Sequence, residues 1–253
     1  MLQTFFRFYA DLNDFLPPHW KQKAFAHTLK EQASIKDVIE ALGVPHPEVD
    51  LILVNGEPVG FDYLIQNCDR ISVYPHFHRI DIAEVSLVRP TPLLQVRFVV
   101  DVHLGKLATY LRLLGFDTLY RNDYEDDELA QISSQEQRIL LTQDRGLLKR
   151  SVVTYGYIVR SHDPEKQVKE VLDRFNLQDA VAPLERCPRC NGRVVIVDKA
   201  EVVDRLPPLT RAHYNQFALC QNCGQVYWKG AHYERIQQLI ARVAPTDDFS
   251  KMP

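Results

Sequence analysis

Short stretches in which apolar and polar residues alternate fill the first part of the chain and predict β-strands. Thr4–Tyr9 and Lys23–Leu29 are the first two predicted strands. A helix follows, because Ser34 is a suitable N-cap with Asp37 three positions later. Gly43 is expected to end that helix, since glycine readily adopts the left-handed conformation found there.

Two more strands complete this region. Leu51–Val54 is an apolar run that ends at the turn pair Asn55 and Gly56, and Ile71–Tyr74 is the final strand. The order strand, strand, helix, strand, strand is that of a β-grasp domain. We therefore predict such a domain over residues 1–84.

Residues 96–181 alternate strands with helices. The predicted strands are Val96–Val100, Asp117–Tyr120, Ile139–Thr142 and Val152–Val159. Leucines recur at helical spacing after the first strand, an acidic helix covers Asp126–Ser133, and Asp163 with Pro164 starts a helix after the fourth strand. This alternation predicts an α/β fold in which crossover helices connect the strands of a parallel sheet.

Four cysteines form two pairs with the same internal spacing, Cys187 with Cys190 and Cys220 with Cys223. Each pair offers two thiolates from one tight turn, and two pairs complete the closed four-sulfur shell of a structural zinc site. The 29 residues between the pairs predict an insertion between two metal-binding turns. Two disulfides or a redox dithiol are the alternatives. We predict a zinc ribbon over residues 182–242.

Composition indicates a soluble globular protein, with 45% hydrophobic and 25% charged residues. No apolar run has the ~18 residues of a membrane helix, and the first residues lack the layout of a signal peptide. Five cysteines, four of them assigned to a metal, fit the reducing cytoplasm. Cys68 is expected to be a buried hydrophobe. His76 and His78 are expected to be surface groups.

Charge is distributed unevenly around a net value of -3. The segment 182–242 has nine basic and five acidic side chains, which makes it net positive before any thiolate is counted. Basic and aromatic residues mix there, a combination that suits single-stranded RNA. In a small zinc lobe the same aromatic residues can instead form the core, and we expect about half of them to be buried for that reason. The mixed set is Arg193, Lys199, Arg211, Lys229, Tyr214, Phe217, Tyr227, Trp228 and Tyr233.

Acidic residues follow the predicted parallel strands. Asp101 comes directly after the first strand, and Asp144 lies two residues beyond the third. Asp123, Asp126 and Asp127 lie after the second strand. Ligands bind at the carboxyl ends of such strands, and gathered carboxylates suit Mg²⁺ or Mn²⁺. Helix capping is the alternative role for Asp126, Asp127 and Asp144.

Three basic residues lie close to these acids in sequence: Lys106, Arg112 and Arg145. Each is a candidate for contact with a substrate phosphate, and each can instead pair with a neighbouring acid.

Several motifs in the second part of the chain carry a resemblance to a known family. They are Phe98–Ala108, Leu111–Thr118, Ile139–Leu148, Arg186–Gly192 and Cys223–His232. Over about residues 96–235 the chain resembles the PIN-like ribonuclease family named after the C-terminal domain of the mutator-seven exonuclease. The resemblance implies a metal-dependent RNase. Its acidic positions map to Asp101, to Asp127 or Asp126, and to Asp144, with Asp123 as a weaker candidate.

The first region has a resemblance of its own. Leu53–Val59 and Asp69–Pro75 are similar to the ubiquitin-like sulfur carriers, whose chemistry needs a free C-terminal Gly-Gly. This chain lacks that ending, so a role in docking a protein partner is left. A non-catalytic adaptor that binds RNA or a ribosome-associated protein is the alternative to a nuclease.

Overall fold

The computed structural model of the protein describes residues 1–77 and 80–243. The chain divides into two compact units, Met1–Leu94 with Glu125–Ile158 and Gln95–Tyr124 with Val159–Pro253. The division does not follow the predicted domains 1–84, 96–181 and 182–242, and those boundaries remain predictions.

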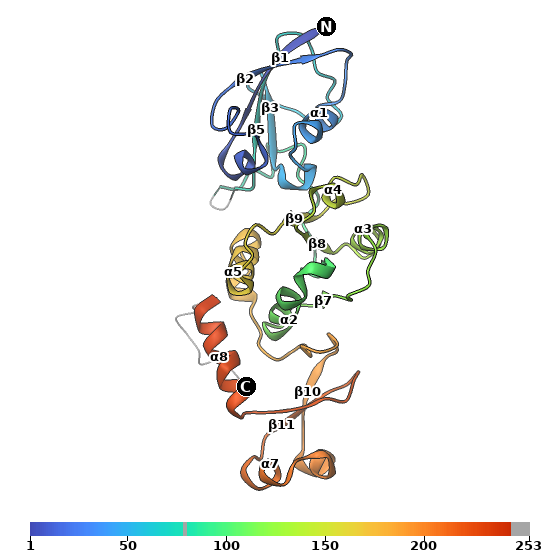
Figure 1. The fold of residues 1–253 in the computed structure, drawn as a ribbon, viewed down its shortest axis with the longest axis vertical. Coiled ribbons are helices and arrows are strands. Elements are labelled where there is room, and N and C mark those ends of the chain that lie inside the picture. The colour runs from blue at the N-terminus through green and yellow to red at the C-terminus, as the bar shows by residue number, and fades with distance from the viewer. Residues whose placement is uncertain (78–79, 244–253) are drawn as a thin grey trace. The chain divides into compact units, whose positions relative to one another are not determined.

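The N-terminal domain (residues 1–84) is a five-stranded sheet with one helix against it (Figure 1). The strands lie in the order β2-β1-β5-β3-β4; β1 and β2 pair antiparallel, whereas β1 and β5 pair in parallel. This mixed sheet confirms the expected β-grasp order. The strands are β1 (Leu2–Phe8), β2 (Phe25–Leu29), β3 (Leu51–Val54), β4 (Glu57–Pro58) and β5 (Arg70–Tyr74).

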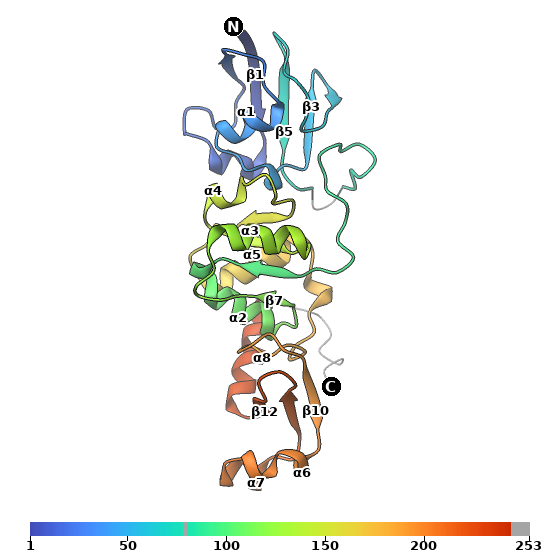
Figure 2. The ribbon, with the colours of Figure 1, turned by 90° about the vertical axis from the view of Figure 1, so that its right-hand side faces the viewer.

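Alternation in β1 explains why its sheet has a core face. Thr4, Phe6 and Phe8 are buried, while Phe5 and Arg7 between them are exposed. Helix α1 (Ile35–Ala41) crosses this face, as Figure 2 shows, and buries Ile35 and Ile39. Apolar contact between α1 and the sheet is thus what holds the domain together.

The local signals in this domain act as predicted. Ser34 Oγ accepts a hydrogen bond from the Asp37 amide at 3.1 Å, which caps α1. Gly43 has a φ of 109°, and Asn55 and Gly56 both have positive φ in the turn between β3 and β4. Cys68 contradicts its prediction, because it is exposed. His76 lies 3.2 Å from an Asp50 carboxylate oxygen, and His78 lies outside the described residues.

The rest of the first unit carries two strands in parallel. β8 (Ile139–Thr142) and β9 (Gly156–Ile158) pair with Leu140 opposite Gly156. Every residue of β8 is buried, as its unbroken apolar run predicts. The helices of this segment are α3 (Asp126–Gln135) and α4 (Arg145–Leu148).

The second unit begins with another parallel pair, β6 (Phe98–Val100) and β7 (Thr118–Leu119), in which Phe98 lies opposite Thr118. The short 3-10 helix η3 (Val102–Leu104) and helix α2 (Gly105–Leu113) connect them. Helix α5 (Pro164–Phe175) begins at the predicted N-cap, Asp163, which accepts two amide hydrogen bonds at 3.0 Å. Val168, Val171 and Leu172 of α5 are buried. The parallel pairs confirm a mixed α/β fold.

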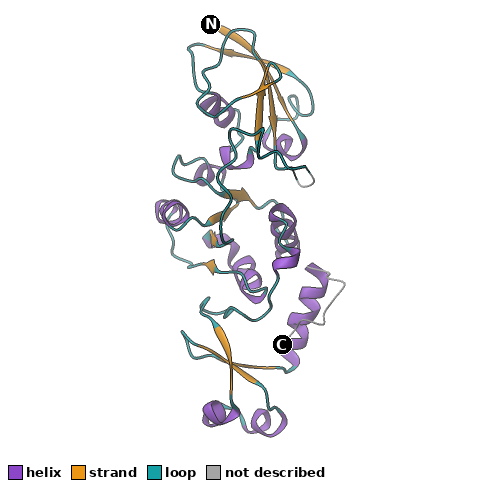
Figure 3. Ribbon diagram, turned by 180° about the vertical axis from the view of Figure 1, so that it is seen from behind, coloured by secondary structure: helices purple, strands orange, loops and turns teal. Residues whose placement is uncertain are grey.

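The cysteine lobe (residues 182–243) is an antiparallel sheet in the order β10-β11-β12 with short helices inserted in it. Its elements are β10 (Val194–Val197), α6 (Lys199–Val202), η5 (Val203–Arg205), α7 (Pro208–His213), β11 (Phe217–Cys220), β12 (Val226–Trp228) and α8 (Ala231–Val243). Figure 3 shows α6 and α7 together at one end of the sheet. They are the insertion that the wide cysteine spacing predicts.

None of the helices within residues 1–77 and 80–243 combines the length and the apolar character of a membrane-spanning segment.

Candidate functional site

Two tight turns at the same end of strands in the cysteine lobe bring the four cysteines together. In the first turn the Asn191 amide donates to the Cys187 carbonyl at 2.8 Å, and in the second the Gly224 amide donates to the Cys220 carbonyl at 2.9 Å. Asn191 and Gly224 both have positive φ, 65° and 70°, which such turns require.

The four sulfur atoms have the spacing of ligands to one ion. All lie within 4.8 Å of one another, with 3.7 Å between Cys187 and Cys223 and 3.5 Å between Cys190 and Cys220. Zn–S bonds of about 2.3 Å place tetrahedral sulfurs about 3.8 Å apart. All four cysteines are free, so the predicted alternative of disulfides does not apply. The cluster can hold a metal such as zinc.

Hydrogen-bond donors lie close to two of the four sulfurs. The Cys223 amide points at the Cys220 sulfur at 3.5 Å, and the Tyr227 hydroxyl lies 3.0 Å from the Cys187 sulfur. Burial, followed by the contact with Cys187, raises the pKa of Tyr227. That hydroxyl therefore stays protonated and can donate to the sulfur. A Cβ at Gly192 would lie 2.9 Å from the Cys220 sulfur, so only glycine lets the backbone come this close.

A buried asparagine ties the first cysteine turn to β7. Asn191 accepts a hydrogen bond from the Thr118 amide at 2.9 Å and donates to the Asp117 carboxylate at 2.8 Å. Arg186 lies 3.3 Å from the other oxygen of that carboxylate. Asn191 is not among the residues predicted from the sequence. The one signal for it was its place between Cys190 and a glycine.

Arg112 does not fit the substrate role predicted for it. Its guanidinium is buried and donates to the carbonyls of Thr118 at 2.9 Å, Pro188 at 3.3 Å and Arg189 at 3.4 Å. Desolvation lowers its pKa, although the thiols of Cys190 and other acidic groups act in the opposite direction. Arg112 bridges α2 and the first cysteine turn, and its burial argues against contact with a phosphate. Lys106, by contrast, is exposed on α2.

Asp101 lies immediately beyond β6, as predicted, and is only 7% exposed. It is the N-cap of η3, where its Oδ1 accepts from the His103 amide at 3.3 Å and lies 3.2 Å from His103 Nδ1. A buried carboxylate at a strand end is held in place and is suited to a cation or a proton donor.

Asp123, which precedes α3, and Asp126 and Asp127 in the first turn of α3 are exposed and have basic neighbours. Asp123 makes a two-point ion pair with Arg121, at 2.9 and 3.0 Å, and that hydrogen bonding lowers its pKa. Asp127 is paired with Arg150, and Asp126 lies 4.0 Å from the same guanidinium. Pairs this exposed are weak and exchange easily.

Asp144 is exposed and caps α4, which was the alternative role for it. Its Oδ1 accepts the Gly146 amide at 2.6 Å, and its own amide donates to Thr142 Oγ1 at 2.9 Å. The side-chain hydrogen bonds of Arg145 do not go to this carboxylate. It donates to the carbonyls of Phe15 and Asp14 in the N-terminal domain. Asp144 and Asp127 belong to the first unit and Asp101 to the second, so their meeting at one ion remains a prediction.

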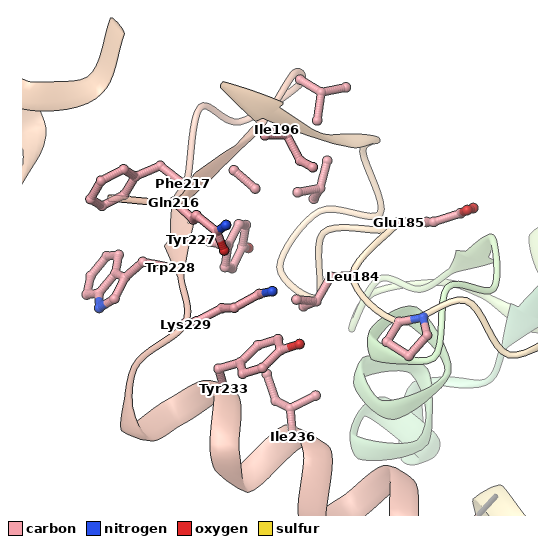
Figure 4. Close-up of a pocket in the computed structure, with 14 residues that line it drawn as sticks. Leu184, Glu185, Ile196, Gln216, Phe217, Tyr227, Trp228, Lys229, Tyr233 and Ile236 are labelled. Carbon is pink, nitrogen blue, oxygen red and sulfur yellow. The ribbon is translucent and has the colours of Figure 1, made fainter. Parts of the chain in front are cut away.

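An apolar pocket of about 350 Å³ lies in the cysteine lobe, between one face of its sheet, the chain at 183–185 and the start of α8. Figure 4 shows Lys229 beside Tyr233 in this pocket and Trp228 turned away from Tyr227. The Lys229 ammonium lies 5.7 Å from the centre of the Tyr233 ring. These two residues offer a cation and an aromatic face together.

The other aromatic residues of the lobe lie mainly in its core, which was the predicted alternative to RNA binding. Phe217 is buried with Val202, Leu206 and Val226, and Tyr214 and Trp228 pack against this cluster. Of the basic residues, Lys199 donates to Asn215 and Arg211 donates to the Val203 carbonyl.

Two family models match the chain. One, the Mut7-C RNAse domain, matches residues 96–240, and the other, the Mut7-C ubiquitin, matches residues 1–81. Comparisons with curated proteins and with solved structures gave no match. The first match covers more than half of the 253 residues, and it includes both cysteine turns as well as Asp101 and Asp144, which follow strands paired in parallel. The chain therefore belongs to the Mut7-C RNAse domain family and carries a ubiquitin-like domain at its N-terminus.

Proposed function

We propose that the protein is a metal-dependent ribonuclease that hydrolyses phosphodiester bonds of RNA. The observation that carries this proposal is its membership of an RNase domain family over residues 96–240. Asp101 and Asp144 support it, since each follows the carboxyl end of a strand paired in parallel, the place where α/β folds bind ligands.

Asp101, Asp127 and Asp144 are the proposed ligands of Mg²⁺ or Mn²⁺, with Asp126 and Asp123 as neighbouring acids. Carboxylates fit such hard cations. When bound, the ion supplies a water of lowered pKa and stabilises negative charge on the phosphate. Asp101 is buried and preset at its strand end, whereas Asp127 is exposed and has only a weak ion pair to give up.

The reaction forms a bond between a water oxygen and phosphorus and breaks the bond to the 3′ oxygen. The expected products have a 5′-phosphate and a 3′-hydroxyl. Lys106 is the proposed phosphate contact on α2, because it is exposed and lies five residues after Asp101.

The cysteine lobe is proposed to be a zinc ribbon that helps to hold RNA. A closed four-sulfur site does no chemistry, so its zinc would be structural. Lys229 and Tyr233 support an RNA contact, since bases stack on aromatic rings while phosphates attract cations.

The test is cleavage of end-labelled single-stranded RNA by full-length protein with Mg²⁺ or Mn²⁺. Asp101→Asn and Asp144→Asn are expected to lower the rate at least 100-fold. Asp198→Asn is the matched control, because Asp198 is also a helix N-cap and asparagine caps equally well. It should cleave like the wild type.

Equal cleavage by all four proteins would point to a contaminating nuclease and defeat the proposal. RNA binding that survives chelation of Mg²⁺, with no cleavage, would favour the non-catalytic adaptor instead. The chelator must be used at a concentration that leaves zinc in place.

A further inference from the structure

The N-terminal domain binds the side chain that directly follows Asp144, and both segments belong to the first compact unit. Arg145 donates from Nη1 to the Phe15 carbonyl at 3.2 Å and from Nη2 to the Asp14 carbonyl at 3.4 Å. The guanidinium carbon also lies 5.0 Å from the centre of the Phe15 ring. Both acceptors lie in the last turn of the 3-10 helix η1 (Ala10–Phe15). One side chain thus combines two hydrogen bonds with a cation–π contact.

A second basic residue, directly after the end of α4, also donates to a backbone carbonyl of the N-terminal domain. Lys149 donates from Nζ to the Glu40 carbonyl of α1 at 2.6 Å. Desolvation, opposed by Glu40, lowers the pKa of Lys149, as expected of an amine that packs against another element. Arg145 and Lys149 therefore fasten both ends of α4 to the N-terminal domain.

Buried polar groups extend the contact to β9. His46 lies between the Glu40 carboxylate, at 2.6 Å from Nδ1, and the Val153 carbonyl, at 2.7 Å from Nε2. Glu48 is only 1% exposed, and its carboxylate accepts the Ile158 amide at 2.7 Å. If the N-terminal domain moved away, the amide and carbonyl of this segment would lose these partners. Leaving buried polar groups unpaired costs about 1–3 kcal/mol each.

We propose that the ubiquitin-like N-terminal domain acts in cis, as a clamp that positions the Asp144 turn. Helix α4 has only four residues, too few to be stable without tertiary contacts. Because Asp144 is its N-cap, the clamp on Arg145 and Lys149 also sets the direction of the Asp144 carboxylate. Arg145 is thus a positioning residue that acts through Asp144. This role rests on the proposed function of Asp144 as a metal ligand.

The clamp makes a different prediction from a phosphate contact at Arg145. Lysine keeps the positive charge but lacks the planar fork that reaches two carbonyls at once. If Arg145 met a phosphate, Arg145→Lys would keep much of the function. If it positions Asp144, Arg145→Lys fails almost as badly as Arg145→Ala.

The experiment compares full-length wild type, Arg145→Ala, Arg145→Lys and Arg7→Ala. Arg7 is the matched control, since it is an exposed arginine of the same domain whose guanidinium lies 4.9 Å from the Tyr9 ring. Amide hydrogen exchange over residues 144–150 is measured without RNA or added metal. Mn²⁺ affinity is measured from the paramagnetic resonance signal of the free ion.

Both Arg145 variants should exchange faster over residues 144–150 and bind Mn²⁺ about 10-fold more weakly, the usual effect of losing a group that orients a metal ligand. Arg7→Ala should match the wild type in both. Unchanged exchange in Arg145→Ala, or full recovery by Arg145→Lys, overturns the clamp. Wild-type protein that binds no Mn²⁺ would defeat the proposed nuclease, and the exchange rates alone would then decide for or against the clamp.

Discussion

Asn191 and Asp117 are joined by a hydrogen bond of 2.8 Å from the asparagine amide to the carboxylate. The same asparagine accepts a hydrogen bond from the Thr118 amide, so one buried side chain connects the first cysteine turn with the edge strand β7. These two hydrogen bonds connect the cysteine lobe to Asp117 and Thr118 at the start of β7. The importance of this connection can be measured.

Asn191→Ala should destabilise the protein by about 1–3 kcal/mol, because it removes these partners from the buried Thr118 amide and from one partly buried oxygen of Asp117. Zinc content should be unchanged, since no sulfur is altered. Urea unfolding followed by circular dichroism gives the loss. Asn215→Ala is the control, since it removes an exposed hydrogen bond with Lys199 and should change stability by less than about 0.5 kcal/mol. Equal effects of the two variants would contradict the anchoring role.

Removal of metal should unfold the cysteine lobe. Structural zinc contributes on the order of 10 kcal/mol to small zinc domains, far more than their small cores. Cys220→Ser should therefore lose the bound zinc and the amide protection of β10 to β12, as measured by elemental analysis and hydrogen exchange. Cys68→Ser is the matched control, because Cys68 is an exposed thiol outside the cluster. If Cys220→Ser retained one zinc per chain, the four-sulfur site would be wrong.

Two glycines with nearly the same φ should respond differently to alanine. Gly115 and Gly56 have φ of 96° and 98°, so each substitution has a strain cost of about 1 kcal/mol. A Cβ at Gly115 would also collide with the backbone carbonyl of Ala182, whereas nothing lies within 4 Å of one at Gly56. Gly115→Ala should lose about 1–3 kcal/mol more than Gly56→Ala in urea unfolding. Similar losses would show that the contact with Ala182 relaxes freely.

Local patterns were sufficient to predict the elements, but not their long-range contacts. Leu51–Val54 and Ile139–Thr142 were predicted with their observed bounds, because unbroken apolar runs between polar turns leave little choice. Val152–Val159 was predicted too long. Only Gly156–Ile158 forms β9, since the Val153 amide closes a turn onto the Arg150 carbonyl and Val152 is exposed.

The candidate site was predictable in its residue types and less so in the roles of its basic residues. The cysteine spacing was sufficient to predict the sulfur cluster. Arg112 and Arg145 were predicted as phosphate contacts because acidic candidates lie near them in sequence. Some of the carbonyls that they bind are far away along the chain: Pro188 lies 76 residues from Arg112, and Phe15 lies 130 residues from Arg145. Backbone carbonyls leave no mark in the sequence, so such partners could not be foreseen.

The stability of the N-terminal domain should depend on pH through His27. This histidine makes an edge contact with Phe6, at 6.1 Å between ring centres, and burial lowers its pKa below the ordinary 6.5. Below pH 6.5 the unfolded chain therefore binds more protons at this position than the folded one. The stabilising contribution is complete above pH 6.5 and is lost as the pH falls from there through the lower folded pKa. One proton limits the slope to about 1.4 kcal/mol per pH unit.

Substitution of His27 by glutamine removes the group that titrates, so the free energy of unfolding should change less between pH 7.5 and 5.5 than in the wild type. The measurement is urea unfolding followed by the fluorescence of Trp20, which stacks on Phe25 of β2 at 4.5 Å. A Trp228→Phe background leaves Trp20 as the one tryptophan of the chain. His213→Gln, a change at an exposed histidine of α7, should keep the wild-type dependence. If His27→Gln also kept the wild-type pH dependence of the free energy of unfolding, other groups would have to cause the acid sensitivity. His27 would then have the same pKa in the folded and the unfolded chain.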